Sequence, residues 1–127
     1  MNGVAIVTVL ALLEYFYFGV LVGNARSKYK VAAPAITGDP VFERYYRVHQ
    51  NTLEQLIIFV PTIWFFGMFM SANIAVALGL LFIIARVIYA RGYIAAPEKR
   101  AVGAAMTFGI NGILAVGAIV GAILHSR

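Results

Sequence analysis

Long apolar segments separated by short polar connections define the pattern of this chain. The first segment runs from Gly3 to Gly23 and is interrupted only by Glu14. A helix needs roughly 20 apolar residues to cross the hydrocarbon core of a bilayer, so this segment is long enough to span it. A cleaved signal peptide is disfavoured because no Lys or Arg precedes the segment and the apolar run is too long. We predict a first membrane helix over residues 3–24.

The second apolar segment, residues 56–70, follows directly on a polar stretch. We predict that both belong to one helix over residues 41–71. At 1.5 Å per residue, about 30 residues reach about 45 Å, which is longer than the hydrocarbon core. The polar half is therefore expected to project beyond the bilayer or to line a cavity. Pro61, in the apolar half, is expected to kink the helix or to free a carbonyl group.

Two further apolar segments predict helices over residues 73–95 and 97–124. A residue that precedes proline is pushed out of the helical region, so the third helix should stop before Pro97. This proline suits the first position of the fourth helix. In the fourth helix Gly117 and Gly121 form a GxxxG pattern, which is typical of closely packed membrane helices.

Composition supports a membrane protein. The 127 residues are 62% hydrophobic and 12% charged, whereas a soluble domain carries about a quarter charged residues. A soluble globular monomer is therefore excluded, because a chain this short has too few polar side chains to cover its surface. The pattern predicts an all-α fold, an integral membrane four-helix bundle in a single domain over residues 1–127. We expect the polar residues 24–40, which include Pro and Gly, to form a structured loop.

Positive charge is concentrated in two connections. Ten Lys and Arg face five Asp and Glu, and nearly all the basic residues lie around residues 26–47 and 86–100. This clustering favours the membrane–water boundary over nucleic acid as the partner. The positive-inside rule places both basic loops in the cytoplasm and both termini, with Arg127, on the other side. The short chain and the absence of an ER-retention ending favour a bacterial inner membrane.

The chain contains no cysteine. Disulfides, thiolate nucleophiles and Cys-based metal sites are thereby excluded, and any thiol chemistry has to be supplied by a ligand. We also expect no metal site, because a lone histidine cannot supply the three or four ligands that zinc requires.

Polar side chains form a stripe on each of two predicted helices. The stripes consist of Arg47, Asn51 and Glu54 on the second helix, and of Arg86, Tyr89 and Tyr93 on the third. Residues at these spacings share one helix face, and both stripes lie near the cytoplasmic helix ends. A carboxylate and an amide beside an apolar stretch are functional candidates. Snorkelling side chains, or an internal ion pair of Glu54 with Arg86 or Arg47, are the structural alternative.

These residue types suit a small zwitterionic peptide. Arginines bind carboxylates in a fork geometry, a glutamate accepts from an ammonium group, and asparagine and tyrosine bind amide groups. Arg100 is expected in the first turn of the fourth helix. There its charge adds to the positive end of the helix dipole, and together they favour the thiolate form of a bound thiol.

The motifs resemble one known family. Residues 42–54 read FERYYRVHQNTLE, residues 37–44 read TGDPVFER, and Ala25-Arg26, Pro61 and Trp64 fit the same pattern. Downstream matches are Ala85-Arg86, Tyr89, Gly92-Tyr93 and Arg100. The whole resembles the MAPEG family, the membrane-associated proteins in eicosanoid and glutathione metabolism.

The resemblance implies a homotrimer that binds glutathione, as co-substrate, between neighbouring subunits near the cytoplasmic side. Carried over by position, the glutathione contacts are Arg26, Arg47, Asn51, Glu54, Tyr89, Tyr93 and Arg100, with His49 as a further donor. Arg100 matches the arginine that holds the glutathione sulfur as a thiolate and is the catalytic candidate. Ser27, His49 and Gln55 depart from leukotriene C synthase, so leukotriene synthesis is not specifically indicated.

The resulting hypothesis is a membrane-bound glutathione transferase or glutathione-dependent peroxidase that acts on lipophilic electrophiles. Two alternatives belong to other classes. One is a non-catalytic lipid-binding protein of the same family. The other is a small multidrug exporter, in which Glu14 within the first span would couple protons to cation export.

Overall fold

The computed structural model describes residues 1–125 as a bundle of long helices. They are α1 (Asn2–Tyr29), α2 (Pro40–Phe69), α3 (Ala72–Ala95) and α4 (Ala101–Leu124), with a short 3-10 helix, η1 (Pro97–Arg100), before α4. Within the described residues, four helical segments are long and apolar enough to cross a membrane. The predicted all-α membrane bundle is confirmed. Arg127 lies outside the described residues.

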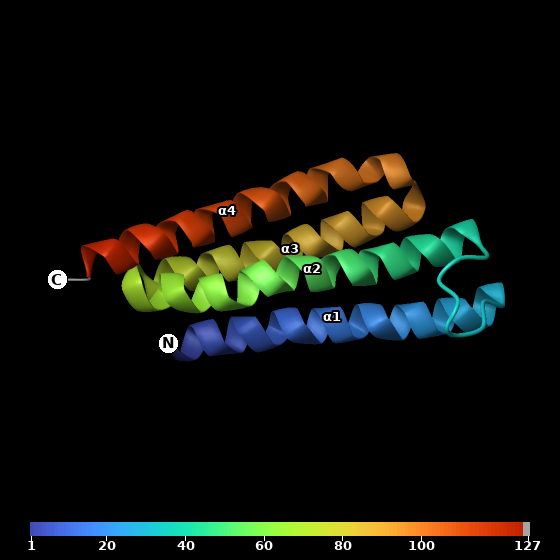
Figure 1. The fold of residues 1–127 in the computed structure, drawn as a ribbon, viewed down its shortest axis with the longest axis horizontal. Helices are drawn as coiled ribbons and strands as arrows, with labels where there is room; N and C mark the ends of the chain where they lie inside the picture. The colour runs from blue at the N-terminus through green and yellow to red at the C-terminus, as the bar shows by residue number, and fades with distance from the viewer. Residues whose placement is uncertain (126–127) are drawn as a thin grey trace.

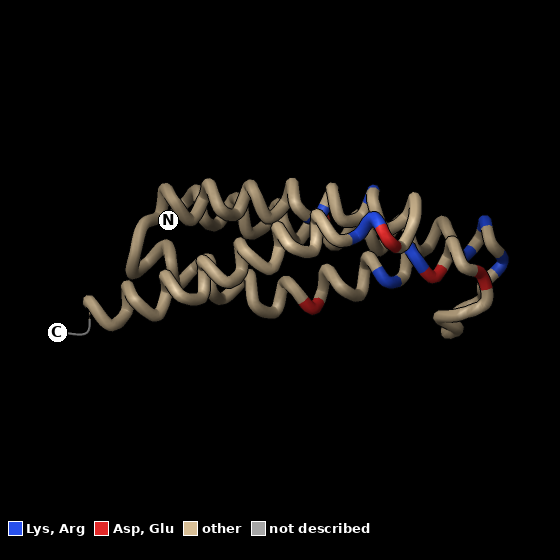
Figure 2. The backbone as a smooth tube through the Cα atoms, turned by 90° about the horizontal axis from the view of Figure 1, so that it is seen from above, with Lys and Arg blue, Asp and Glu red and all other residues tan. Residues whose placement is uncertain are grey.

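The helices alternate in direction, and α2 and α3 lie between α1 and α4 (Figure 1). As a result α1 runs parallel to α3, and α2 runs parallel to α4. The loop 30–39 and η1 lie at the same end of the bundle (Figure 1). The charged residues gather in this half, and the other half is almost free of them (Figure 2).

One predicted boundary is wrong. We expected the first helix to stop near residue 24, but α1 continues to Tyr29. The stop comes at Lys30, which adopts the left-handed conformation with φ 57° and donates its backbone N–H to the Arg26 carbonyl. Arg26 and Lys28 in the last turn complement the negative end of the helix dipole. The change from apolar to polar residues therefore marks where the helix leaves the apolar layer, not where it ends.

The start of the last helix also differs from the expectation. We predicted one helix from residue 97, but Pro97–Arg100 forms a 3-10 turn and the α-helix begins at Ala101. The connection is tight, because a side chain at Gly92 would overlap the backbone carbonyl of Lys99. Arg100 is consequently the N-cap residue of α4.

Small residues bring the helices close together. Gly117 and Gly121, the predicted packing motif, lie against Phe66 and Phe69 of α2. A side chain at Gly103 would overlap the backbone of Tyr89, so the start of α4 lies directly on α3. This contact sets the position of Arg100 relative to the tyrosines of α3.

Candidate functional site

A cavity of about 430 Å³ opens at the charged end of the bundle, between α2, α3 and the start of α4. Its lining is polar and consists of Arg47, Gln50, Asn51, Glu54, Tyr89, Tyr93 and Arg100. The structure therefore brings together six of the eight site residues expected from the sequence, and their role in binding stays a prediction. Gln50 also lines the cavity, although the polar stripe predicted on the second helix did not include it.

The register of α2 is set at its N-terminus. Asp39 caps the helix, because its Oδ1 accepts hydrogen bonds from the backbone N–H groups of Val41 and Phe42, both at 2.9 Å. One turn later Arg44 donates to the carbonyls of Ile94 and Ala95 at 3.1 and 3.3 Å. It thereby satisfies free carbonyl groups at the end of α3. These contacts fix the face of α2 that carries the cavity residues.

The opposite wall joins α3 to α4. The rings of Tyr89 and Tyr93 lie 5.7 Å apart and are tilted by 58°. The Arg100 guanidinium lies 5.7 Å from the centre of the Tyr93 ring and donates to the Pro97 carbonyl at 3.3 Å. Arg100 is exposed and stands at the N-terminus of α4, where the dipole of the helix is positive. A thiolate beside Arg100 would be stabilised by the guanidinium charge and by the positive end of the α4 dipole.

A buried arginine lies behind this lining. Arg86 has 0% exposure and donates to Asn51 Oδ1 at 2.8 Å, to Thr52 Oγ1 at 3.0 and 3.3 Å, and to Thr107 Oγ1 at 3.2 Å. Its guanidinium also lies 4.1 Å from the centre of the Tyr89 ring. The hydrogen bonds of Arg86 thus go to neutral side chains and not to Glu54, so the Arg86 form of the ion-pair alternative is wrong. Glu54 instead accepts from Asn51 Nδ2 at 3.4 Å.

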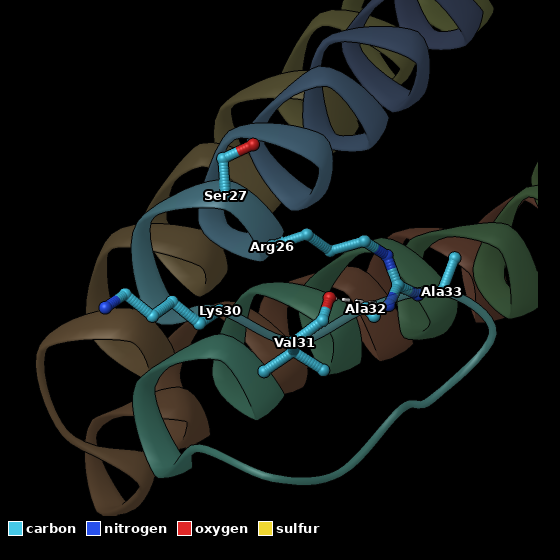
Figure 3. A pocket seen from close by; sticks show the side chains of 6 residues that line it. All are labelled: Arg26, Ser27, Lys30, Val31, Ala32 and Ala33. Atoms are coloured by element: carbon cyan, nitrogen blue, oxygen red, sulfur yellow. Dashed lines mark hydrogen bonds between the residues drawn. The ribbon is translucent and has the colours of Figure 1, made fainter.

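Two predicted residues lie elsewhere in the chain. Arg26 donates to the Ala35 carbonyl at 2.6 Å and lies over the Phe42 ring at 4.9 Å. It lines a separate cavity of about 450 Å³ beside the loop after α1, where Arg26 and Lys30 point in opposite directions (Figure 3). His49 stacks on Tyr15 of α1, with ring centroids 4.3 Å apart. A single chain therefore does not bring Arg26 or His49 to the polar cavity.

Glu14 is held inside the protein. Both of its carboxylate oxygens are buried and have no hydrogen-bond partner among the described residues. The residue borders an apolar cavity of about 470 Å³ between α1 and α3. Glu14 thus lies beside an apolar cavity and outside the polar cavity that contains the predicted site residues.

The cavity offers charges of both signs, amides and phenols. Arg47 and Arg100 can bind carboxylates or a thiolate, and Glu54 can accept from an ammonium group. Residues 1–125 contain no group of three or more His, Asp or Glu placed to hold a metal ion. The chemistry of the lining therefore fits a small peptide with ionised ends.

Comparison with known proteins identifies a family and several relatives of this chain. The model of the MAPEG family matches residues 4–120. The chain is 43% identical over 123 residues to an uncharacterized protein of Synechocystis sp., covering 97% of this chain and 90% of that protein. It is 42% identical over 110 residues to human microsomal glutathione S-transferase 2, covering 87% and 75% of the two chains. It is also 36% identical over 96 residues to bovine leukotriene C4 synthase, covering 76% and 64%.

The contacts of Arg86 generate a stability prediction. Replacing Thr107 by Val removes an acceptor and leaves a buried guanidinium N–H without a partner. We expect Thr107→Val to lower the free energy of unfolding by about 1–3 kcal/mol. Thr62→Val is the matched control, because Thr62 donates to the Ile58 carbonyl of its own helix at 2.7 Å just as Thr107 donates to Gly103 at 2.8 Å. Thermal unfolding in detergent measures the stability of both variants. An equal loss of stability in Thr107→Val and Thr62→Val would contradict the prediction.

Proposed function

Because the chain belongs to the MAPEG family, we propose that it is a membrane-bound glutathione transferase that conjugates glutathione to lipophilic electrophiles. The same thiolate would also reduce lipid hydroperoxides: its sulfur attacks the peroxide oxygen, the O–O bond breaks and the alcohol leaves after taking up a proton. A second glutathione then converts the glutathione sulfenic acid to glutathione disulfide and water. The observation that carries the proposal is the polar cavity, which places Arg47, Glu54 and Arg100 around one space at the charged end of a membrane bundle. Relatives named as glutathione S-transferases support the choice of ligand.

Each charged group has a role in this mechanism. Arg47 binds a carboxylate of glutathione, Glu54 accepts from its ammonium group, and the tyrosines and amides bind its peptide groups. Arg100 stabilises the thiolate after the thiol proton has left to water. The sulfur then attacks an electrophilic carbon. A C–S bond forms, and the displaced group leaves with its electron pair or, for an opened ring, takes up a proton.

The electrophile arrives from the apolar side. About two helical turns after Arg100, the outer face of α4 begins to line an apolar cavity of about 600 Å³ together with Phe66 and Met70 of α2. Phe108 and Ile113 of α4, which line this cavity, are exposed. An apolar substrate dissolved in the bilayer can lie in this cavity and extend toward the thiolate, while glutathione enters from the aqueous end.

We further propose a homotrimer in which the neighbouring subunit completes the site. Arg26 and His49 do not line the polar cavity of their own chain: Arg26 contacts the loop after α1 and the Phe42 ring, and His49 stacks on Tyr15 of α1. A neighbour packed against the cavity face would supply Arg26 and His49 to glutathione. The charge distribution orients this assembly, with the two basic loops in the cytoplasm of a bacterial inner membrane.

Thiolate formation tests the proposed chemistry. Glutathione titrated into the purified protein at neutral pH should give a saturable ultraviolet difference signal from a thiolate. Arg100→Ala should lose this signal and lower kcat/KM by about 10²–10³-fold with 1-chloro-2,4-dinitrobenzene, whereas Arg100→Lys should keep part of both because it retains the charge. S-methylglutathione, which has no ionisable thiol, should bind without the signal.

The outcomes separate the candidate functions. Full turnover by Arg100→Ala would contradict the role of this residue. Glutathione binding by the wild type without turnover of any electrophile or hydroperoxide would favour the non-catalytic lipid-binding alternative. Absence of glutathione binding by the wild type would contradict the proposed function itself.

Mixed assemblies test the shared site. Arg26→Ala chains and Arg47→Ala chains, each inactive alone, should regain part of the glutathione binding when they are co-expressed. Some interfaces then combine an intact Arg47 from one subunit with an intact Arg26 from its neighbour. If Arg26 served the cavity of its own chain, every site in the mixture would lack one arginine. Binding that stays as low in the mixture as in either variant would contradict the shared site.

A further inference from the structure

Arg86 is the largest fully buried side chain in the described structure. A guanidinium group in the interior of a membrane bundle is costly unless its donors are hydrogen-bonded. It does not line the polar cavity, so it does not itself bind a ligand there. It nevertheless contacts two residues that do, Asn51 and Tyr89.

The contact with Asn51 decides which way the amide points. An arginine side chain has donors and no acceptor, so the Asn51 atom that faces it has to be the carbonyl oxygen. Arg86 Nη2 donates to this oxygen at 2.8 Å. The amide nitrogen of Asn51 therefore points the other way, toward Glu54 Oε1 at 3.4 Å. Asn51 consequently offers the cavity an N–H donor, with an acceptor from Glu54 beside it.

The guanidinium cannot turn away from Asn51, because other contacts fix its plane. Thr52 and Thr107 donate their own hydroxyl hydrogens to the carbonyls of Val48 and Gly103, both at 2.8 Å. Their oxygen lone pairs are thus free to accept from Arg86, one threonine from α2 and the other from α4. The planar fork of an arginine matches this arrangement, whereas the single ammonium group of a lysine cannot reach all three acceptors.

Arg86 also supports the ring of Tyr89. The guanidinium lies 4.1 Å from the ring centre, in the range of a cation–π interaction. Tyr89 is 4% exposed, so its position depends on the groups packed around it, and it still borders the cavity. One buried group thereby orients a side chain on α2 and a side chain on α3.

We propose that Arg86 is a positioning residue of the glutathione site, which acts by holding the Asn51 amide with its N–H group toward the ligand and the Tyr89 ring in place. This inference rests on the proposed function, because the ligand is glutathione. Without Arg86 the Asn51 amide can turn over and present a carbonyl oxygen where the ligand needs a donor.

The experiment compares Arg86→Lys with the wild type in the full-length protein. Arg86→Lys keeps the charge but loses the fork, so we expect the glutathione Kd and KM to rise about tenfold, the effect of one lost hydrogen bond. The KM for 1-chloro-2,4-dinitrobenzene and the thiolate absorbance per bound glutathione should stay unchanged, because both depend on Arg100 and the apolar cavity. In an Asn51→Ala background, Arg86→Lys should have little further effect on glutathione affinity.

A matched control separates positioning from a general loss of stability. Leu114→Ala lowers stability by removing a fully buried apolar side chain of α4 that neither lines the polar cavity nor bonds to Arg86, so glutathione affinity should stay near that of the wild type. A rise in KM for Leu114→Ala equal to that for Arg86→Lys would overturn the inference. So would full additivity of Arg86→Lys with Asn51→Ala.

A second variant keeps the test valid if Arg86→Lys does not fold. Asn51→Asp retains an oxygen for Arg86 and places a second oxygen where the N–H donor stands, which imitates the turned amide. We expect it to weaken glutathione binding at least as much as Asn51→Ala, and wild-type affinity would overturn the inference. If the wild type binds no glutathione, the proposed function fails as well. If the wild type binds and Arg86→Lys binds equally well, this inference alone fails.

Discussion

Lipid offers no hydrogen bonds, and this constraint governs where the polar groups of the bundle lie. Every polar group within the apolar layer has to be satisfied inside the protein. Arg86 illustrates the solution, because its donors are taken up by Asn51, Thr52 and Thr107 from the two helices packed beside α3. Side chains of α2, α3 and α4 therefore meet at one buried guanidinium, which ties these three helices together.

The same network gives the cavity its chemistry. On α3, Arg86 is buried in the core and stabilises the fold, whereas Tyr93 lines the cavity and is available for the proposed binding. On α2 the same two roles fall to adjacent residues, since Thr52 is fully buried and Asn51 lines the cavity. A charged cavity thus lies on the same helices, α2 and α4, as an apolar cavity that begins about two turns further along α4, a combination that suits the proposed conjugation at a membrane.

Much of the fold could be predicted from hydropathy alone, because a membrane-length apolar run has few alternative structures. The resemblance to the MAPEG family, drawn from residues 42–54, is confirmed. Helical periodicity also placed Arg47, Asn51 and Glu54 on one face correctly. The end of α1 was wrong, because polarity reports the edge of the apolar layer and the helix continues to Tyr29. Sequence patterns did not predict that Arg86 is buried or that Arg26 and His49 lie away from the cavity. These features depend on how the helices pack against one another, and the periodicity of a single helix carries no information about that packing.

A structure of the full-length protein in a lipid bilayer with bound glutathione tests the central claim most directly. The account predicts glutathione in the cavity lined by Arg47, Asn51 and Glu54, with its sulfur beside Arg100 and with Arg26 of a neighbouring subunit in contact. The Asn51 carbonyl should still face Arg86. Glutathione bound elsewhere, for instance between α1 and α3 beside Glu14, or a cavity that stays empty at saturating glutathione, would contradict the account.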